Sequence, residues 1–523
     1  MEEELRSAMD LQEAGRPDEA LAICETVLSL DPNSARALFI RGLSRADMRN
    51  FEAALADLET AIALDPRLEY AQGAALYLSM WMCHWGGFAQ KVEKLLSALE
   101  AGYPVIKPYP LLSLPSSARQ QMTAASYASA DKSIASHESI PQSIGGDGKI
   151  RLGYFSGDFY DHAVSHLVHG LFKNHDRSKF ETLGFAFGGN ASDPVRGLIK
   201  SNVDQFFDIT NMSARDITAL AHKLGIHIAI DLSLYTSPLP AIFAQGIAPI
   251  QVNFLGCPGT SGSPDYDYII GDRFVTPPEE CDAFSERIVT MPHSYQVNTF
   301  RDFSKLRDFS RQELNLPDKG FVFCCFNQHF KITPDAFEVW MRLLSKVEGS
   351  VLWLLDCNDI AKRNLQSEAK KQGVRPDRLI FAPRMPLADH LSRHKQADLF
   401  LDTFHYNAHT TASDALWTGL PIVTRLGQAF ASRVAASLLT SAGVPDMITE
   451  NSAAYEALAL ELASQPEKLA EIRTRVEDGK LNCPLFDTKR YARNIESAFA
   501  QMWDRHSSGQ KPASFSVHDV KAV

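Results

Sequence analysis

The alternation of short apolar runs with helical segments in the second half of the chain constrains the fold more than any other feature. Each run is short enough to be one buried strand, and a segment with helical periodicity follows it. We predict strands at 321–326, 351–355, 379–381, 399–401 and 422–424, and helices at 334–347, 360–372, 387–395, 411–417 and 433–440. Apolar strands that alternate with helices indicate a parallel sheet covered on both faces.

A region of similar character begins at Lys149. Its predicted strands are 150–155, 226–232, 250–254, 268–270 and 288–289. A charged stretch at 301–318 separates the two regions, so we expect two doubly wound lobes, residues 149–305 and 306–523. The end of the second lobe is expected to be helical to about Trp503, with a polar tail that frays. Open α/β sheets bind ligands outside the carboxyl ends of their strands, and residues that follow strands are therefore the candidates for a site.

The N-terminal part carries an internal repeat with an offset of 34 residues. Asp18–Ala22 recurs as Glu52–Ala56, and Leu30–Pro32 recurs as Leu64–Pro66. This period, with small residues at helix contacts and a proline after the second helix, is the tetratricopeptide signature. Two copies are few for an independent array, so we expect the all-helical region 1–100 to pack against the rest of the chain.

The segment between the repeats and the first lobe changes character twice. Residues 71–100 look helical and strongly apolar, as a degenerate third repeat unit would, and we interpret Trp81 and Trp85 as core residues rather than ligand contacts. Residues 101–115 contain four prolines, and the segment ends in the glycine-rich Gly145–Gly148. We predict a linker at 101–148.

Composition excludes several classes of protein. The chain has 523 residues and a net charge of −11, which argues against a protein that coats nucleic acid. Its apolar runs are too short to span a membrane, and the acidic N-terminus lacks a signal-peptide core. The eight cysteines form no CxxC pair, so neither a zinc site nor a disulfide framework is expected. We expect a cytoplasmic protein without a resident metal or cofactor; its oligomeric state stays open.

The stretch His409–Asp414 follows a predicted strand and opens a predicted helix. Thr410 and Thr411 are candidate N-caps for that helix. The free amides and partial positive charge of a helix N-terminus suit a phosphate. A capped helix in any α/β protein would look the same, and sequence chemistry alone leaves both interpretations open.

Other polar residues follow neighbouring strands. Gln328 and Lys331 come after the first strand of the second lobe, where a lysine can pair with a diphosphate. His390 and Arg393 begin a helix after the third strand and are candidates to face a nucleoside. The alternative interpretations are that Lys331 is a solvated lysine before a helix, and that His390 and Arg393 are polar residues on a solvent-exposed helix face. No P-loop or GxGxxG motif is present.

The first lobe offers a loop histidine and a glycine-rich turn. His162 follows the first strand and could take a proton from a hydroxyl, although a histidine bonded to loop backbone is the alternative. Leu255 and Gly256 open a turn after a strand, which is either a ligand-approaching loop or merely a tight turn.

These motifs together resemble the O-GlcNAc transferase (SPINDLY-like) family of glycosyltransferases in its short bacterial form. The resemblance covers nearly the whole chain. The matching segments are Ala248–Gln251, Leu255–Gly262, Phe326–Ile332, His409–Asp414, Ala431–Ala435 and Pro484–Asp487. It implies a GT-B fold of two Rossmann-like lobes after the repeats. It also implies an inverting, metal-independent transfer of a sugar, most simply N-acetylglucosamine from UDP-GlcNAc, to serine or threonine of a protein acceptor bound near the repeats.

The resemblance also implies roles for single residues. On the donor side, Gln328 and Lys331 meet the diphosphate, Thr410 and Thr411 bind it with His409 alongside, Asp414 takes the ribose hydroxyls, and His390 lies against the base. On the acceptor side, His162, His227 and the Leu255–Gly256 turn line the sugar, and His162 or His227 assists proton removal.

Three positions depart from the family pattern: Phe330 replaces a common tyrosine, Leu387 a frequent lysine and Ala163 a frequent proline. The donor therefore stays open among UDP-GlcNAc, UDP-glucose and GDP-fucose. An asparagine or small-molecule acceptor, or a degenerate repeat scaffold without activity, are the remaining alternatives. No nucleic-acid or membrane partner is expected.

Overall fold

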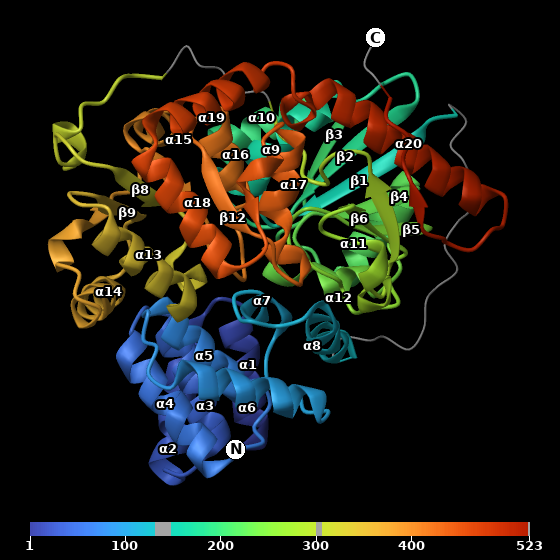
Figure 1. Ribbon diagram of the computed structural model, residues 1–523. Coiled ribbons are helices and arrows are strands. Elements are labelled where there is room, and N and C mark those ends of the chain that lie inside the picture. The colour runs from blue at the N-terminus through green and yellow to red at the C-terminus, as the bar shows by residue number, and fades with distance from the viewer. Residues whose placement is uncertain (131–147, 300–305, 521–523) are drawn as a thin grey trace.

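The computed structural model describes residues 1–130, 148–299 and 306–520. A helical N-terminal part lies against two α/β lobes (Figure 1). Its first six helices are α1 (Glu2–Glu13), α2 (Pro17–Leu30), α3 (Ala35–Asp47), α4 (Phe51–Leu64), α5 (Ala71–Trp81) and α6 (Phe88–Glu100). The small residues that recur at the repeat offset, among them Ala20 and Ala54, are fully buried between helices, as the repeat pattern predicts. The helices α5 and α6 occupy the segment 71–100, and its predicted helical character is confirmed.

The predicted linker contains two helices, α7 (Pro108–Leu111) and α8 (Ala118–Ala130). The expectation of irregular structure was therefore wrong up to residue 130, because the alanine-rich 118–130 favours a helix once the prolines have ended. Helix α8 packs on the first lobe, where the Tyr235 hydroxyl donates to the Ala125 carbonyl at 3.0 Å. The rest of the predicted linker, including most of the glycine-rich segment, lies outside the described residues.

The first lobe is built on an eight-stranded sheet in which every neighbouring pair is parallel, in the order β14-β7-β6-β5-β4-β1-β2-β3. Its strands are β1 (Ile150–Ser156), β2 (Phe180–Ala186), β3 (Gln205–Asp208), β4 (Ile228–Asp231), β5 (Ile250–Asn253), β6 (Tyr268–Asp272), β7 (Arg287–Met291) and β14 (Phe515–Ser516). The helices between them are α9 (Ala163–Asn174), α10 (Pro194–Asn202), α11 (Ala214–Leu224) and α12 (Leu239–Phe243). The five predicted strands are confirmed, whereas β2, β3 and β14 were missed.

The second lobe has a six-stranded parallel sheet in the order β10-β9-β8-β11-β12-β13. Its strands are β8 (Val322–Cys325), β9 (Val351–Leu355), β10 (Leu379–Ala382), β11 (Leu399–Leu401), β12 (Ile422–Arg425) and β13 (Ile448–Thr449). Its helices are α13 (Pro334–Lys346), α14 (Asp359–Lys371), α15 (Leu387–Arg393), α16 (Thr410–Trp417), α17 (Val434–Ser441), α18 (Ser452–Ser464) and α19 (Pro466–Gly479). The alternation predicted from apolar runs is confirmed strand by strand, with the short edge strand β13 added.

The C-terminal segment returns to the first lobe. Helix α20 (Thr488–Ser507) packs on α9, and β14 pairs with β7 (Figure 1). The expected fraying tail is therefore wrong for this stretch, because Phe515 packs against Tyr268 and the Ser514 hydroxyl accepts a hydrogen bond from the Ile288 amide at 2.9 Å. Within the described ranges, no helix has the length and apolar character needed to cross a membrane.

Candidate functional site

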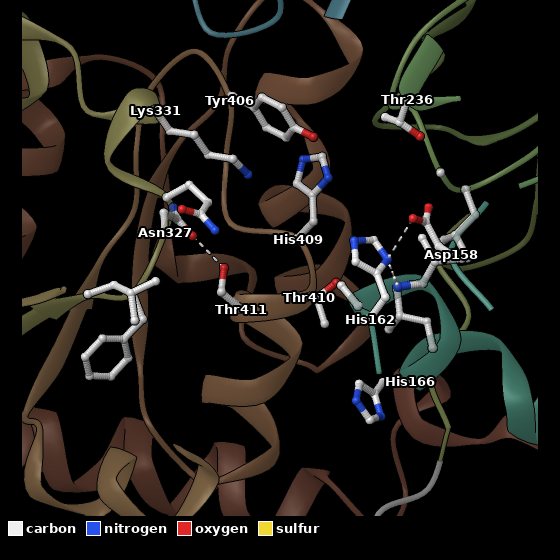
Figure 2. A pocket seen from close by; sticks show the side chains of 18 of the residues that line it. Asp158, His162, His166, Thr236, Asn327, Lys331, Tyr406, His409, Thr410 and Thr411 are labelled. Carbon is white, nitrogen blue, oxygen red and sulfur yellow. Dashed lines mark hydrogen bonds and ion pairs between the residues drawn. The ribbon is translucent and has the colours of Figure 1, made fainter. Parts of the chain in front are cut away.

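A cavity of about 910 Å³ lies between the two lobes and the helical N-terminal part. Loops at the carboxyl ends of strands from both sheets form most of its walls, as the doubly wound architecture predicts. Ten of the proposed site residues line it: His162, Leu255, Gly256, Gln328, Lys331, His390, Arg393, His409, Thr410 and Thr411. Figure 2 shows side chains of the second lobe, among them Lys331 and His409, and side chains of the first lobe, among them Asp158, His162 and Thr236.

Lys331 ends the short helix η5 (His329–Lys331), which directly follows β8. Its ammonium donates to the Asn407 carbonyl at 3.3 Å and lies over the ring of Tyr406. Burial lowers the pKa of Lys331 to about 7, although the nearby Asp402 carboxylate opposes this shift. A partly buried lysine whose charge has little compensation from the protein is prepared to receive an anion.

A buried polar network supports this side of the cavity. Asp402 accepts hydrogen bonds from the Thr424 hydroxyl at 2.6 Å and the Ala408 amide at 2.6 Å, and burial raises its pKa to about 7. The Asn327 amide donates to Asp402 at 3.3 Å, and its carbonyl oxygen accepts from the Thr411 hydroxyl at 2.5 Å (Figure 2). The network fixes the start of α16 relative to β8.

The start of α16 differs in detail from the prediction. Neither Thr410 nor Thr411 is the N-cap; His409 is, because its backbone is non-helical (φ −110°, ψ −90°) and its carbonyl accepts the first helical bonds, from Ala412 and Ser413. Within the described residues, the amides of Thr410 and Thr411 have no backbone acceptor. They are therefore available to an anion at the helix N-terminus.

His409 itself is held by the protein. Its Nε2–H donates to the Ala431 carbonyl at 3.0 Å. Burial, and secondly the charge of Lys331, lower the pKa of His409 well below its ordinary value, so the ring is neutral. Its Nδ1 is consequently a hydrogen-bond acceptor, which suits a sugar or ribose hydroxyl rather than a phosphate.

His390 and Arg393 lie on α15 and contact each other. Arg393 donates to His390 Nδ1 at 2.6 Å and to the Pro383 carbonyl at 2.5 Å. Since a guanidinium can only donate, His390 carries its proton on Nε2. That Nε2 lies 4.0 Å from the carboxylate of Asp414, which is buried behind the cavity wall and does not line the cavity.

The first lobe contributes His162, which is the N-cap of α9. Its Nδ1 accepts from the Val164 amide at 3.4 Å and lies 3.6 Å from the Asp158 carboxylate (Figure 2). Burial raises the pKa of Asp158, and the neighbouring His162 opposes that shift. The other ring nitrogen, Nε2, makes neither of these contacts, and the ring lines the cavity.

The Leu255–Gly256 turn also lies on this wall. Leu255 adopts a left-handed backbone conformation (φ 69°), which costs a residue with a side chain about 1 kcal/mol. A Cβ atom at position 256 would lie 1.9 Å from the Leu232 carbonyl oxygen, so only glycine fits. The backbone of the turn therefore packs directly against the backbone of Leu232 and Ser233, which follow β4.

His227 does not reach the cavity. It precedes β4, at the amino end of the sheet, where its Nδ1 accepts from the Arg151 amide at 2.9 Å and its ring packs on Trp503 with centroids 4.4 Å apart. The structure therefore does not bring this predicted catalytic residue to the site. The predicted strand 226–232 already indicated this, because His227 is its second residue and ligands bind beyond the carboxyl end.

The N-terminal helices and α7 contribute a wall that the sequence analysis missed. Tyr77 and Trp81 of α5 and Tyr109 of α7 line the cavity. Trp81 packs against Phe330, with ring centroids 5.1 Å apart, as a core residue would, but it also lines the cavity, which was not predicted. Trp85 packs in the core against Phe337. Nothing in the local pattern distinguishes an aromatic residue of a helix contact from one that faces a cavity.

Asp158, Asn327, Arg384 and Tyr406 are further lining residues that were not predicted. Asp158 lies in the same loop as the predicted His162, and Asn327 directly precedes the predicted Gln328. Their position in loops that follow strands could have identified them as candidates. In the parts of the chain that the structure describes, no group of three or more histidine, cysteine, aspartate or glutamate residues could hold a metal ion.

Sequence comparisons match both parts of the chain. A sequence model described as glycosyl transferase family 41 matches residues 82–308 and 304–495, and one described as tetratricopeptide repeat matches residues 11–78. A probable UDP-N-acetylglucosamine–peptide N-acetylglucosaminyltransferase SEC of Arabidopsis thaliana is 37% identical over 71% of this chain and 39% of its own length. A UDP-N-acetylglucosamine–peptide N-acetylglucosaminyltransferase of Caenorhabditis elegans is 27% identical over 82% of this chain and 48% of its own length. The chain spans less than half the length of these curated relatives.

Among solved structures, a mutant of the Thermobaculum terrenum O-GlcNAc transferase aligns with a TM-score of 0.77 and 24% sequence identity. The alignment covers 97% of this chain and 98% of that one. It confirms the predicted fold, helical repeats followed by a GT-B arrangement of two Rossmann-like lobes.

Proposed function

The chain belongs to glycosyl transferase family 41, and we propose that it transfers N-acetylglucosamine from UDP-GlcNAc to serine or threonine hydroxyls of proteins. The observation that carries the proposal is the partly buried amine of Lys331, which lines the same cavity as the N-terminus of α16. Together they offer a positive charge and oriented amides to a diphosphate. The names of the two curated relatives support the choice of sugar and of a peptide acceptor.

The donor is proposed to lie along the carboxyl edge of the second sheet. Lys331, Gln328 and the start of α16 would hold the diphosphate. The nucleoside would extend toward α15, where His390 meets the base. Asp414, which does not line the cavity, would act through His390, whose Nε2 lies 4.0 Å from its carboxylate. This assignment uses the strand order, in which β8 and β11 are neighbours and β10 is two strands away from β8.

The reaction that fits this arrangement is a single displacement with inversion at the anomeric carbon. The acceptor oxygen forms a bond to C1 of the sugar while the bond from C1 to the β-phosphate oxygen breaks, and the electron pair leaves with UDP. Lys331 and the amides of α16 neutralise the charge that grows on the leaving group, so we propose that no metal ion takes part.

The proton of the acceptor hydroxyl is proposed to pass to Nε2 of His162, in the tautomer whose Nδ1–H turns to the Asp158 carboxylate instead of accepting from the Val164 amide. Asp158 lies at the other ring nitrogen and would stabilise the imidazolium that forms. The acceptor protein would enter past the aromatic wall of α5 and α7, which places the repeats next to the reacting atoms.

The test is incubation of the purified chain with UDP-GlcNAc, UDP-glucose or GDP-fucose and a mixture of bacterial proteins. We expect a mass increase of one N-acetylhexosamine on acceptor proteins with UDP-GlcNAc alone, and loss of that mass under alkaline β-elimination, which releases O-linked sugars. A sugar that resists elimination would contradict the serine or threonine acceptor. Absence of both transfer and UDP-induced thermal stabilisation would overturn the whole proposal.

A further inference from the structure

A buried segment that follows β7 contacts helices of both lobes. It comprises residues 294–299, and we call it the crossover segment. Three of its polar side chains, Ser294, Gln296 and Thr299, are each at most 6% exposed. A buried polar group is costly unless it is hydrogen-bonded, so the partners of these three show what the segment holds.

The first partner is helix α9 of the first lobe. The Thr299 hydroxyl donates to the Leu167 carbonyl at 2.8 Å and accepts from the Gly170 amide at 2.9 Å. A Cβ atom at Gly170 would lie 2.7 Å from the Thr299 side chain, so the segment and the helix are in direct contact. Thr299 therefore fixes the crossover segment to the helix whose N-cap is His162.

The second partner is helix α16 of the second lobe. The Gln296 side-chain amide donates to the Ser413 hydroxyl at 2.8 Å. Ser413 is buried in the first turn of α16, where its own backbone amide donates to the His409 carbonyl. The amides of Thr410 and Thr411, which are proposed to receive the diphosphate, belong to the same turn.

A chain of hydrogen bonds fixes the start of the crossover segment. The Gln296 backbone amide donates to Ser294 Oγ at 3.1 Å, and Ser294 Oγ lies 3.0 Å from Ser437 Oγ on α17. The Ser437 hydroxyl donates to the Asp272 carboxylate at 2.6 Å, and Asp272 also accepts from the Tyr295 amide at 2.8 Å. Since Asp272 ends β6, side chains of both lobes determine the conformation of the segment.

The segment is short, and the proposed reaction needs both of the helices that it contacts. Gln296 and Thr299 are three residues apart, at most about 10 Å of extended chain, so a short link joins α16 to α9. In the proposed reaction the leaving group lies at the start of α16, and the acceptor hydroxyl lies at His162, at the start of α9. A misplacement of about 1 Å between reacting groups can lower a rate about 100-fold.

We propose that Gln296 is a positioning residue for sugar transfer. Through Ser413 it holds the start of α16 at a fixed distance from the first lobe, where His162 lies. This inference rests on the proposed function. Because Gln296 also lines the cavity, its test must separate an action through Ser413 from direct contact with the reactants.

The test removes the hydrogen bond from each side, in Gln296→Leu, in Ser413→Ala and in the double variant. Initial rates of transfer from UDP-GlcNAc to the bacterial protein mixture give kcat and the KM for the donor. We expect kcat to fall about 10- to 100-fold in each single variant and no further in the double variant, because both changes remove one contact. The Kd for UDP and the KM should stay unchanged, since the bond from Thr411 to Asn327 still joins α16 to β8.

The matched control is Thr182→Val on β2. It removes the hydrogen bond from another buried hydroxyl, which donates to Asp204 at 2.9 Å within the first lobe and does not line the cavity. This variant should lose thermal stability as the test variants do and keep the wild-type kcat. If Gln296→Leu does not fold, the comparison of Ser413→Ala with Thr182→Val decides.

Three results would overturn the inference. Loss of kcat in Gln296→Leu alone, with wild-type kcat in Ser413→Ala, would mean that Gln296 contacts the reactants itself. Weaker UDP binding in parallel with the loss of kcat would mean that the bond maintains the donor site rather than the alignment of the lobes. Wild-type kcat in both single variants would leave the bond without a role in transfer. A wild-type chain that transfers no sugar would instead contradict the proposed function, and thus the two failures are distinguishable.

Discussion

The ammonium of Lys331 lies 3.5 Å from the centroid of the Tyr406 ring. An aromatic face and one backbone carbonyl replace only part of the water that a lysine loses on burial, and for this reason the pKa of Lys331 falls to about 7. The same ring lies 6.3 Å from Tyr109 and 5.0 Å from His409, centroid to centroid. Tyr406 thus joins Lys331, the proposed leaving-group site of the second lobe, to the short helix α7 that comes after the repeats.

Replacement of Lys331 by alanine tests its part in leaving-group stabilisation. We expect kcat for sugar transfer to fall about 100- to 1,000-fold, because a preorganised charge would be lost where negative charge develops. UDP should also bind more weakly. Steady-state kinetics with UDP-GlcNAc measure the effect, with Lys370→Ala on the exposed face of α14 as the control. Transfer at near wild-type rate would disprove the role.

The pH dependence of UDP binding tests the lowered pKa of Lys331 directly. Above pH 7 the free protein holds this lysine mainly neutral, whereas a bound diphosphate favours the ammonium. Binding should therefore take up a proton, and affinity should fall by up to about tenfold per unit as the pH rises above 7. Calorimetry in buffers of different ionisation enthalpy counts the protons. Equal proton uptake by Lys331→Ala would assign the effect to another group.

The sequence located most of the cavity wall on the second lobe, because the residues of that wall follow strands. Gln328 follows β8 and His390 begins the helix after β10, and in each case an apolar run marks the strand whose end positions the side chain. The start of α16 was located within one residue. Its cap was misassigned because capping depends on backbone angles and on the competing bond from Thr411 to Asn327, which residue types do not reveal.

The parts that sequence could not predict depend on contacts between distant segments. Tyr77, Trp81 and Tyr109 belong to helices whose apolar faces look like ordinary core, and only the docking of α5 on the second lobe turns two of them toward the cavity. The strand β14 has two residues and gains its place from pairing with β7. The prediction that His227 belongs to the site was wrong for a local reason. The direction of β4 places His227 at the amino end of the sheet, whereas the cavity lies at the carboxyl ends of the strands.

Asp158→Asn tests whether the carboxylate beside His162 positions the proposed base. We expect kcat to fall about 100-fold, because the imidazolium formed during transfer would lose its counter-charge. The KM for UDP-GlcNAc and the Kd for UDP should stay unchanged, since Asp158 belongs to the first lobe. If UDP affinity falls in parallel with kcat, Asp158 acts on the donor and the positioning role is wrong.

Gly256→Ala tests the close approach at the Leu255–Gly256 turn. A Cβ atom would lie 1.9 Å from a backbone oxygen that cannot move without distorting the end of β4. We expect a loss of roughly 3 kcal/mol in the free energy of unfolding, measured by denaturant titration. Gly259→Ala is the matched control, because the nearest atom to its Cβ would be Leu112 Cδ2 at 3.8 Å. Equal stability of the two variants would contradict the steric account.

The joint between the repeats and the second lobe should weaken in acid. The Trp81 carbonyl accepts from His329 Nε2 and from the Asn358 amide, each at 2.8 Å. Burial lowers the pKa of His329 to about 4, against about 6.5 in an unfolded chain. The unfolded state therefore binds the proton more readily, so the stabilisation is complete above pH 6.5 and is lost as the pH falls toward 4.

Within that window, the protonation of His329 alone should lower the free energy of unfolding by up to about 1.4 kcal/mol for each unit of falling pH. Thermal denaturation between pH 4 and 7 measures this dependence. The variant His329→Gln cannot take up a proton, so its stability should depend less on pH in this range (the acid limb of the curve), although it should be somewhat less stable at pH 7. His84→Gln, at an exposed position of the same joint, should leave the limb as it is. If His329→Gln keeps the wild-type slope, acid instability arises elsewhere, and the neutral His329 only packs against Trp81, 5.0 Å away between ring centroids.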